Sequence, residues 1–140
     1  MARRTERKLQ AQKGGLIRFV RYFWHLLEPQ TELVEGWPLE AICEHLEAIT
    51  FGKINRLLIN VPPGFMKSLL CSVFFPAWLW GPFHKPGLRI IGTSYSERWA
   101  LRDSLRMRNV VTADWFTSKW PIHLVKDGER KIENSKRGWR

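Results

Sequence analysis

The stretch Leu57–Trp78, LLINVPPGFMKSLLCSVFFPAW, constrains the fold more than any other part of the chain. Strand-forming apolar residues come first, a turn follows at Pro62-Pro63-Gly64, and a helix-like apolar run begins directly after it. The segment Arg56–Val61 (RLLINV) has the short, near-continuous apolar pattern of a strand buried on both faces of a parallel sheet. We therefore expect a strand, a tight turn and a helix in direct succession.

A second segment, Gly87–Ser96 (GLRIIGTSYS), repeats the strand pattern after the expected helix. Strand, helix and strand in this order form a βαβ unit, whose ligand crevice lies at the carboxyl ends of the strands. The predicted fold is therefore α/β, a parallel sheet flanked by helices as in P-loop NTPases and incomplete at its C-terminal end. Residues 16–140 are assigned to this partial domain, and residues 1–15 to a basic flexible arm.

Apolar residues at helical spacing predict three longer helices outside this unit. The first begins at Leu16 and ends before Pro29, and the second runs from Pro38 to Gly52. The third spans about 95–110, with Ser94 and Glu97 in the form of a capping box. Beyond it, residues 112–121 (TADWFTSKWP) predict a short helix or turn, and residues 122–140 predict two short strands around an Asp-Gly turn.

The turn before Lys67 departs from the usual phosphate-loop fingerprint, G-x-x-x-x-G-K-[ST], because Val61 and Met66 stand where its two glycines belong. Gly64 can still adopt a positive φ inside the turn, and the two prolines stiffen the entry from the strand. A bulky Met66 directly before the lysine must then adopt a backbone conformation that glycine normally supplies. Lysine at a helix N-terminus is disfavoured by the helix dipole, so Lys67 favours a bound anion there.

The charge balance and the cysteines limit the partners and the compartment. With 23 Lys and Arg residues against 13 Asp and Glu residues, the formal net charge is +10, which favours a polyanion such as nucleic acid. Cys43 and Cys71 lack metal-ligand spacing and are expected to be buried, reduced thiols, which suggests the cytosol. No apolar run has the length of a membrane span.

Several segments together carry a resemblance to a known family. Residues 60–70 (NVPPGFMKSLL), 74–81 (FFPAWLWG) and 89–100 (RIIGTSYSERWA) resemble the ATPase part of the large terminase subunit of tailed bacteriophages. The segments FWHLLEP, GWPLEAICEHLEAI and INRLLINVPP stand in the same order as in that family, so the resemblance extends from about Leu16 to the end of the chain.

The resemblance implies a motor that couples ATP hydrolysis to the translocation of double-stranded DNA into proheads. It implies ATP and Mg²⁺ as cofactors, with Lys67 at the phosphates and Ser68 at the Mg²⁺. The residues that it implies for nucleotide binding are Pro63, Gly64, Phe65, Met66, Lys67, Ser68 and Leu69. Its implied partners are DNA, the small terminase subunit, the portal protein and further copies in a ring, in the cytoplasm of a bacterial host.

Other candidate residues keep more than one interpretation. Arg98, Arg102 and Arg106 stand four apart and line one helix face, which would contact DNA phosphates, reach a nucleotide in a neighbouring subunit, or remain a solvated surface. Trp37 would stack on an adenine or staple the start of its helix.

Two parts of the family pattern are missing before Arg140, namely the acidic motif that activates water and the nuclease carboxylates. Asp114 is the nearest acidic candidate, but its surroundings fit a turn better. The chain is therefore expected to be the front portion of a longer protein, with hydrolysis by this portion an open question. The alternative functions are another P-loop DNA motor, such as a helicase, and a non-enzymatic basic DNA-binding protein.

Overall fold

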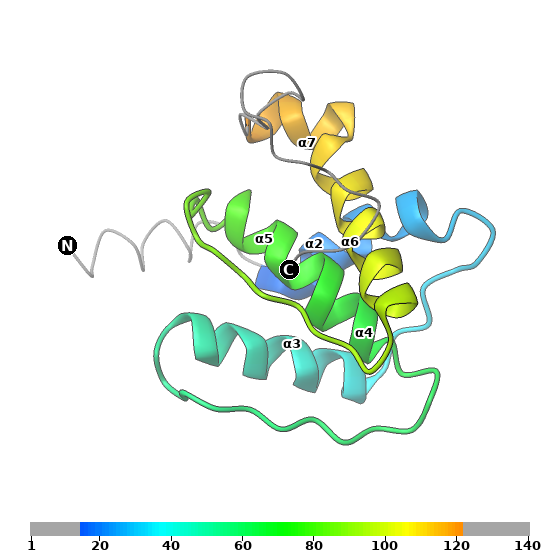
Figure 1. Cartoon of the computed structure of the whole chain (residues 1–140), viewed down its shortest axis with the longest axis vertical. Coiled ribbons are helices and arrows are strands. Elements are labelled where there is room, and N and C mark those ends of the chain that lie inside the picture. The colour runs from blue at the N-terminus through cyan, green and yellow to red at the C-terminus, as the bar shows by residue number, and fades with distance from the viewer. Residues whose placement is uncertain (1–14, 122–140) are drawn as a thin grey trace.

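The computed structural model describes residues 15–121, which form helices joined by extended segments (Figure 1). In chain order the helical segments are α2 (Gly15–Leu27), α3 (Trp37–Thr50), α4 (Lys67–Leu69), the π-helical turn η1 (Leu70–Phe74), α5 (Phe75–Trp80), α6 (Glu97–Thr112) and α7 (Asp114–Lys119). The helices expected from Leu16, from Pro38 and over 95–110 are confirmed, as is the short helix within 112–121. The basic arm, apart from its last residue, and the two strands expected within 122–140 lie outside the described residues.

Helix α2 forms because its apolar residues recur on one face, and the residues of that face are all buried: Leu16, Phe19, Val20 and Phe23. The first turn of α2 is tied to α3 by the amide of Leu16, which donates a 2.6 Å hydrogen bond to the Glu47 carboxylate. The opposite face carries Arg21, which forms a bidentate pair with Glu35. Helix α2 therefore packs against α3 through apolar side chains, and the hydrogen bond from Leu16 to Glu47 joins the two helices at the start of α2.

The buried side chains form one core cluster, to which every helix from α2 to α7 except α4 contributes. Its members are Leu16, Phe19, Val20, Phe23, Leu39, Ile42, Cys43, Leu46, Leu70, Val73, Phe74, Ala77, Trp78, Leu79, Val110, Val111 and Phe116. Within this cluster Phe19, Phe74 and Phe116 meet edge to face, at ring-centroid distances of 6.4 Å and 6.2 Å from Phe19. No buried side-chain polar atom among residues 15–121 lacks a hydrogen-bond partner.

The segments α4, η1 and α5 are one uninterrupted helical stretch from residue 67 to residue 80. Its middle widens into a π-turn, in which the Phe75 amide donates to the Leu70 carbonyl oxygen. Pro76 follows at once, and its ring lacks an N–H group and would clash with the carbonyl of an ordinary α-helical turn. The wide turn therefore lets the helix continue through a proline.

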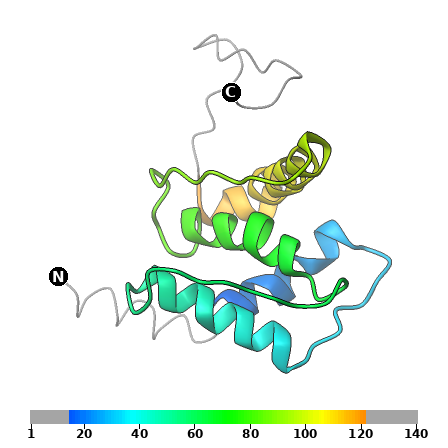
Figure 2. The ribbon, with the colours of Figure 1, turned by 60° about the horizontal axis from the view of Figure 1, so that its bottom comes forward.

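The prediction of a parallel sheet is wrong, because residues 15–121 contain no strand. Residues 56–61 and 87–96 contain no strand and pair with no other segment of the described chain, and Figure 2 shows them on opposite sides of the helix that runs from α4 to α5. In the first segment only alternate residues, Leu57, Ile59 and Val61, pack against the core, while Leu58 is 84% exposed. In the second segment Ile91 is 90% exposed. An apolar run alone does not distinguish a buried strand from an extended connection that covers a helix with every second side chain.

The predicted capping box at the start of α6 is also wrong. Helix α6 begins at Glu97 with Ser96 as its N-cap residue, and no side chain caps it. Ser94 lies two residues before that cap, in the exposed connection.

The prediction for the cysteines is confirmed for Cys43, while Cys71 is only partly buried, and both are free thiols. Burial raises the pKa of Cys43 to about 12, and the pKa of Cys71 is raised for the same reason. Among residues 15–121, no helix combines the length and the apolarity that crossing a membrane requires.

Candidate phosphate-binding site

The backbone between Pro63 and Lys67 turns sharply because two of its residues have positive φ. Gly64 has φ 93°, as the sequence predicted, and Met66 has φ 57° and ψ 10°, in the left-handed region. Residues other than glycine are uncommon in that region, above all bulky ones. Those that do adopt it concentrate at functional sites. Met66 therefore supplies the conformation that glycine supplies in the usual fingerprint.

The turn leads directly into the first turn of a helix. Met66 is the N-cap residue of α4, and its carbonyl oxygen accepts a 2.9 Å hydrogen bond from the Leu70 amide. The first amides of a helix have no partner within the helix, and here no side chain caps them. Lys67, Ser68 and Leu69 therefore present unsatisfied backbone donors at the positive end of the helical stretch 67–80.

Two side chains with the right chemistry for a phosphate extend from the same turn. Lys67 and Ser68 are exposed, and neither forms an ion pair or a side-chain hydrogen bond with any residue of 15–121. The Lys67 ammonium group lies close enough to Cys71, one helical turn on, to oppose the rise in the pKa of that thiol. Among the described residues, no carboxylate neutralises the positive charge of Lys67.

Apolar contacts hold this loop against the body of the protein. Met66 and Leu69 are partly buried and pack against the core, whereas Pro63, Gly64 and Phe65 are exposed. A Cβ atom added at Gly64 would meet no atom within 4 Å. The outer side of the loop is therefore open to a ligand.

The left-handed backbone at Met66 makes a testable prediction about stability. Met66→Gly and Met66→Ala remove almost the same side chain, but only alanine keeps the Cβ atom that is strained at φ 57°. We expect the glycine variant to be the more stable of the two by about 1 kcal/mol in urea unfolding. The same pair of substitutions at Ser68, which lies inside α4, is the control and should favour alanine. Equal stabilities at position 66 would mean that this residue is not left-handed in solution.

The site offers little to a metal ion beyond one hydroxyl group. Residues 15–121 contain no cluster of three or more His, Cys, Asp or Glu side chains that could hold a metal. Asp114 begins α7, which packs at the end of α5, whereas α4 is at the other end of the same helical stretch (Figure 1). Since Mg²⁺ keeps several waters and is often held by substrate phosphates, Ser68 fits a Mg²⁺ ion that arrives with a nucleotide.

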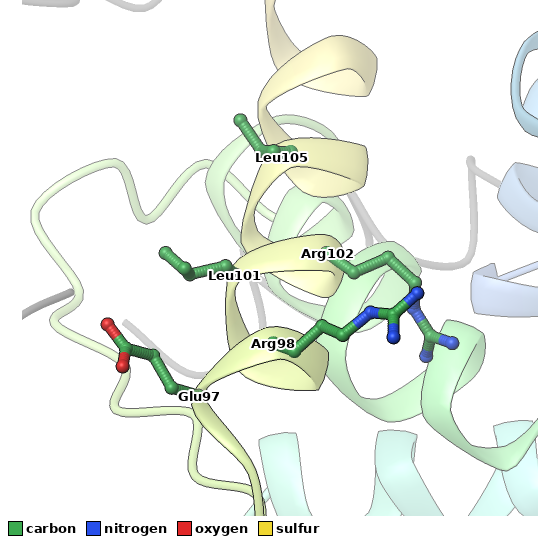
Figure 3. A pocket seen from close by; sticks show the side chains of 5 residues that line it. All are labelled: Glu97, Arg98, Leu101, Arg102 and Leu105. Atoms are coloured by element: carbon green, nitrogen blue, oxygen red, sulfur yellow. The ribbon is translucent and has the colours of Figure 1, made fainter. Parts of the chain in front are cut away.

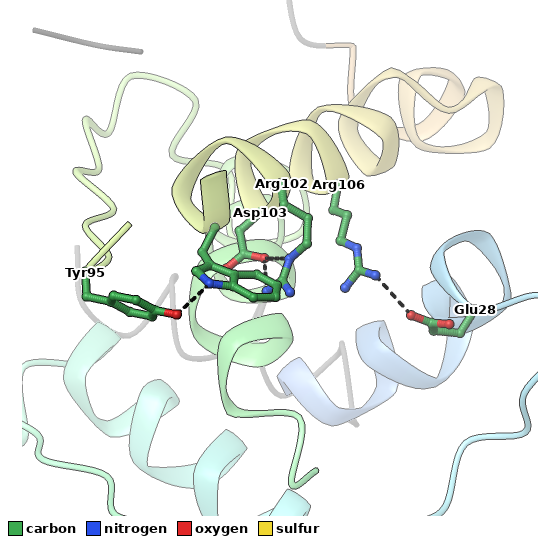
Figure 4. Close-up of polar contacts among 6 residues, drawn as sticks. Glu28, Tyr95, Arg102, Asp103 and Arg106 are labelled. Carbon is green, nitrogen blue, oxygen red and sulfur yellow. Dashed lines mark hydrogen bonds and ion pairs between the residues drawn. The ribbon is translucent and has the colours of Figure 1, made fainter. Parts of the chain in front are cut away.

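No hydrogen bond or ion pair within residues 15–121 joins the other candidate residues to the loop. Trp37 starts α3, is 79% exposed and makes no ring contact within the described part of the chain. Arg102 pairs with Asp103 at 2.7 Å, and Arg106 reaches Glu28 at 3.4 Å (Figure 4). The three arginines are therefore not one uniform basic face, because two of them are paired.

Two aromatic residues beside these arginines, Tyr95 and Trp99, were not identified from the sequence as candidate site residues. The Trp99 indole N–H donates a 2.9 Å hydrogen bond to the Tyr95 hydroxyl, and the Arg102 guanidinium lies 4.3 Å from the centroid of the Trp99 ring. Their spacing along the predicted helix could have identified this cluster. Tyr95 and Trp99 are four residues apart, Trp99 and Arg102 are three apart, and side chains at these spacings are neighbours on a helix.

Comparison of the chain with models of protein families, with curated proteins and with solved structures gave no match.

Proposed function

We propose that this chain is the nucleotide-binding part of a phage DNA-packaging motor, a large terminase subunit, and that residues 63–69 hold the phosphates of ATP. The observation that supports the proposal most is the left-handed Met66 immediately before Lys67 at the start of a helix. This left-handed residue stands where the usual fingerprint has a glycine, which supports the proposal although both customary glycines are replaced. The proposal rests on this local geometry and on the resemblance of the sequence, not on a sheet.

Each group of the loop has one role in the proposed complex. The amides at the start of α4 donate to phosphate oxygens, and the Lys67 ammonium neutralises charge on the outer phosphates. The Ser68 hydroxyl contacts the Mg²⁺ that accompanies the nucleotide. These groups bind and orient a triphosphate, and transfer of its terminal phosphoryl group depends mainly on such positioning and electrostatics. Within residues 15–121, no carboxylate forms an ion pair with Lys67, and the proposal assigns no residue to the activation of water.

The remaining elements of the proposal follow from the resemblance. The motor would act on double-stranded DNA in the cytoplasm of a bacterial host, together with a small terminase subunit and a portal protein. Copies of the subunit would form a ring, in which Arg98 or Arg102 would reach a neighbouring nucleotide. Trp37 would stack on the adenine.

The direct test is calorimetric titration of Mg-ATP into the full chain and into Lys67→Ala. We expect the lysine variant to bind at least about tenfold more weakly, because a charge-assisted hydrogen bond contributes about 1.5–3 kcal/mol. Lys53→Ala is the matched control, since Lys53 is also exposed but lies beyond the end of α3. It should leave the affinity within about twofold. Equal affinities of the original chain and Lys67→Ala would remove the proposal.

A further inference from the structure

The N-terminal half of α6 and the residue before its cap carry a cluster of rings and guanidinium groups, which we call the α6 cluster: Tyr95, Arg98, Trp99 and Arg102. Tyr95 is 92% exposed and Trp99 is 37% exposed. The Trp99 ring has the Arg102 guanidinium 4.3 Å from its centroid and the Arg98 guanidinium at 6.0 Å. Two rings and two cations thus share one exposed surface.

The contacts inside the cluster fix the orientation of Trp99. Tyr95 accepts a hydrogen bond from the indole N–H, and Arg102 is held in turn by two hydrogen bonds from its Nε and Nη2 atoms to the Asp103 carboxylate, at 2.9 Å and 2.7 Å (Figure 4). A ring held on two sides loses little conformational entropy when a ligand stacks on it.

The three arginines of α6 that stand four residues apart differ in what they can still bind. Arg102 is paired with Asp103, and Arg106 is paired with Glu28. Arg98 forms no ion pair with any residue of 15–121, and its side chain is exposed. Figure 3 shows Arg98 and Arg102 extending in the same direction from α6. Arg98 is therefore the cation of the cluster whose charge is available to an anion.

The shape of this surface favours a polymer over a small molecule. The surface beside the cluster is open, and the residues Glu97, Arg98, Leu101, Arg102 and Leu105 that line it all come from α6. Figure 3 shows Arg98 and Arg102 on one side of this helix and Leu101 and Leu105 on the other. An open surface formed by a single helix cannot enclose a ligand as small-molecule sites do. An extended polymer that lies across the helix can bind to such an open surface.

We propose that the α6 cluster binds single-stranded nucleic acid, with an unpaired base stacked on Trp99 or Tyr95 and the adjacent phosphate at Arg98. Exposed rings next to a cation are the groups that bind single strands without sequence preference. The net charge of +10 attracts any polyanion, but a duplex keeps its base faces stacked inside, so only a single strand can use the rings. The proposal does not require nucleotide binding by residues 63–69, and it gives Arg98 a different role from contact with a neighbouring nucleotide.

The test compares fluorescently labelled oligothymidylate with a duplex of the same length, by anisotropy and with the full chain. We expect Trp99→Leu to weaken single-strand binding about tenfold and to leave duplex binding unchanged, since stacking accounts for the lost affinity. Tyr95→Leu should act in the same direction, and it keeps the fold because Tyr95 is almost fully exposed. Tyr22→Leu, at an exposed ring outside the cluster, is the control and should change neither affinity.

The salt dependence tests the phosphate contact separately. Arg98→Gln should reduce the slope of log affinity against log salt by about 0.7 for the single strand, the value for one lost phosphate contact. Arg56→Gln removes the same charge from an exposed residue outside α6 and should leave the slope unchanged. An equal loss of single-strand and duplex binding in Trp99→Leu, or the absence of any effect, would overturn the proposal. Titration of Mg-ATP into Trp99→Leu should match the original chain, which separates this proposal from that for residues 63–69.

Discussion

Replacing Phe74 with alanine is expected to lower the free energy of unfolding by about 3–5 kcal/mol. The Phe74 side chain is fully buried, and its ring meets Phe19 edge to face at 6.4 Å. It lies in η1, which contacts α2, α3, α4, α5 and α6. Because α2, α3 and α6 all pack against this one helical stretch, they cannot all move to fill the cavity that the substitution leaves.

The measurement is urea unfolding followed by circular dichroism, with Phe51→Ala as the control. Phe51 is 41% exposed, so its truncation should cost about 1 kcal/mol or less. Should Phe74→Ala unfold during purification, Phe74→Leu should give a folded protein with a smaller loss in the same direction. Similar stabilities of the alanine variants at 74 and 51 would contradict the arrangement of the core described above.

The second large effect is expected at Gly81, where α5 ends. A Cβ atom added to Gly81 would lie 2.7 Å and 2.9 Å from atoms of the Phe116 ring and 3.2 Å from Trp120. Phe116 is fully buried and is held by Phe19, Phe23 and Trp120, so its ring cannot move aside freely. Gly81→Ala should therefore destabilise the fold by about 1–3 kcal/mol, as overpacking does in well-packed cores.

Gly87→Ala is the matched control for this substitution, since a Cβ atom at Gly87 would meet no atom within 4 Å. The loss of backbone freedom in the unfolded chain should make that variant neutral or more stable by up to about 1 kcal/mol. The two variants should thus shift the thermal midpoint differently, with a clear loss only at position 81. A stable Gly81→Ala protein would show that α7 does not pack against the end of α5.

The helices could be predicted from the sequence because their apolar residues recur at the helical period. Leu16, Phe19, Val20 and Phe23 all lie on the buried face of α2, as that spacing requires. That residues 15–121 form no sheet could not be predicted, because an apolar run does not show which other segment packs against it. Leu58 and Ile91 both stand in apolar runs that predict a strand, yet both are exposed in unpaired segments.

The candidate loop was predictable in part, because backbone requirements follow from residue type. The positive φ of Gly64 was expected, and the position of Met66 before Lys67 identified the residue that had to be left-handed. Contacts between distant parts of the chain were not predictable from local pattern. The pair between Glu28 and Arg106 joins residues 78 apart, and the spacing of Arg106 alone had suggested a free basic face.

The π-turn at Leu70–Phe74 has a consequence for the direction in which the loop faces. A wide turn uses about one residue more than an α-helical turn, and each residue rotates the side-chain direction by about 100°. Lys67 and Ser68 therefore point about that much further round the helix than they would in an α-helix continued backward from α5. Pro76, which requires the wider turn, therefore affects the direction in which Lys67 points, nine positions earlier in the chain.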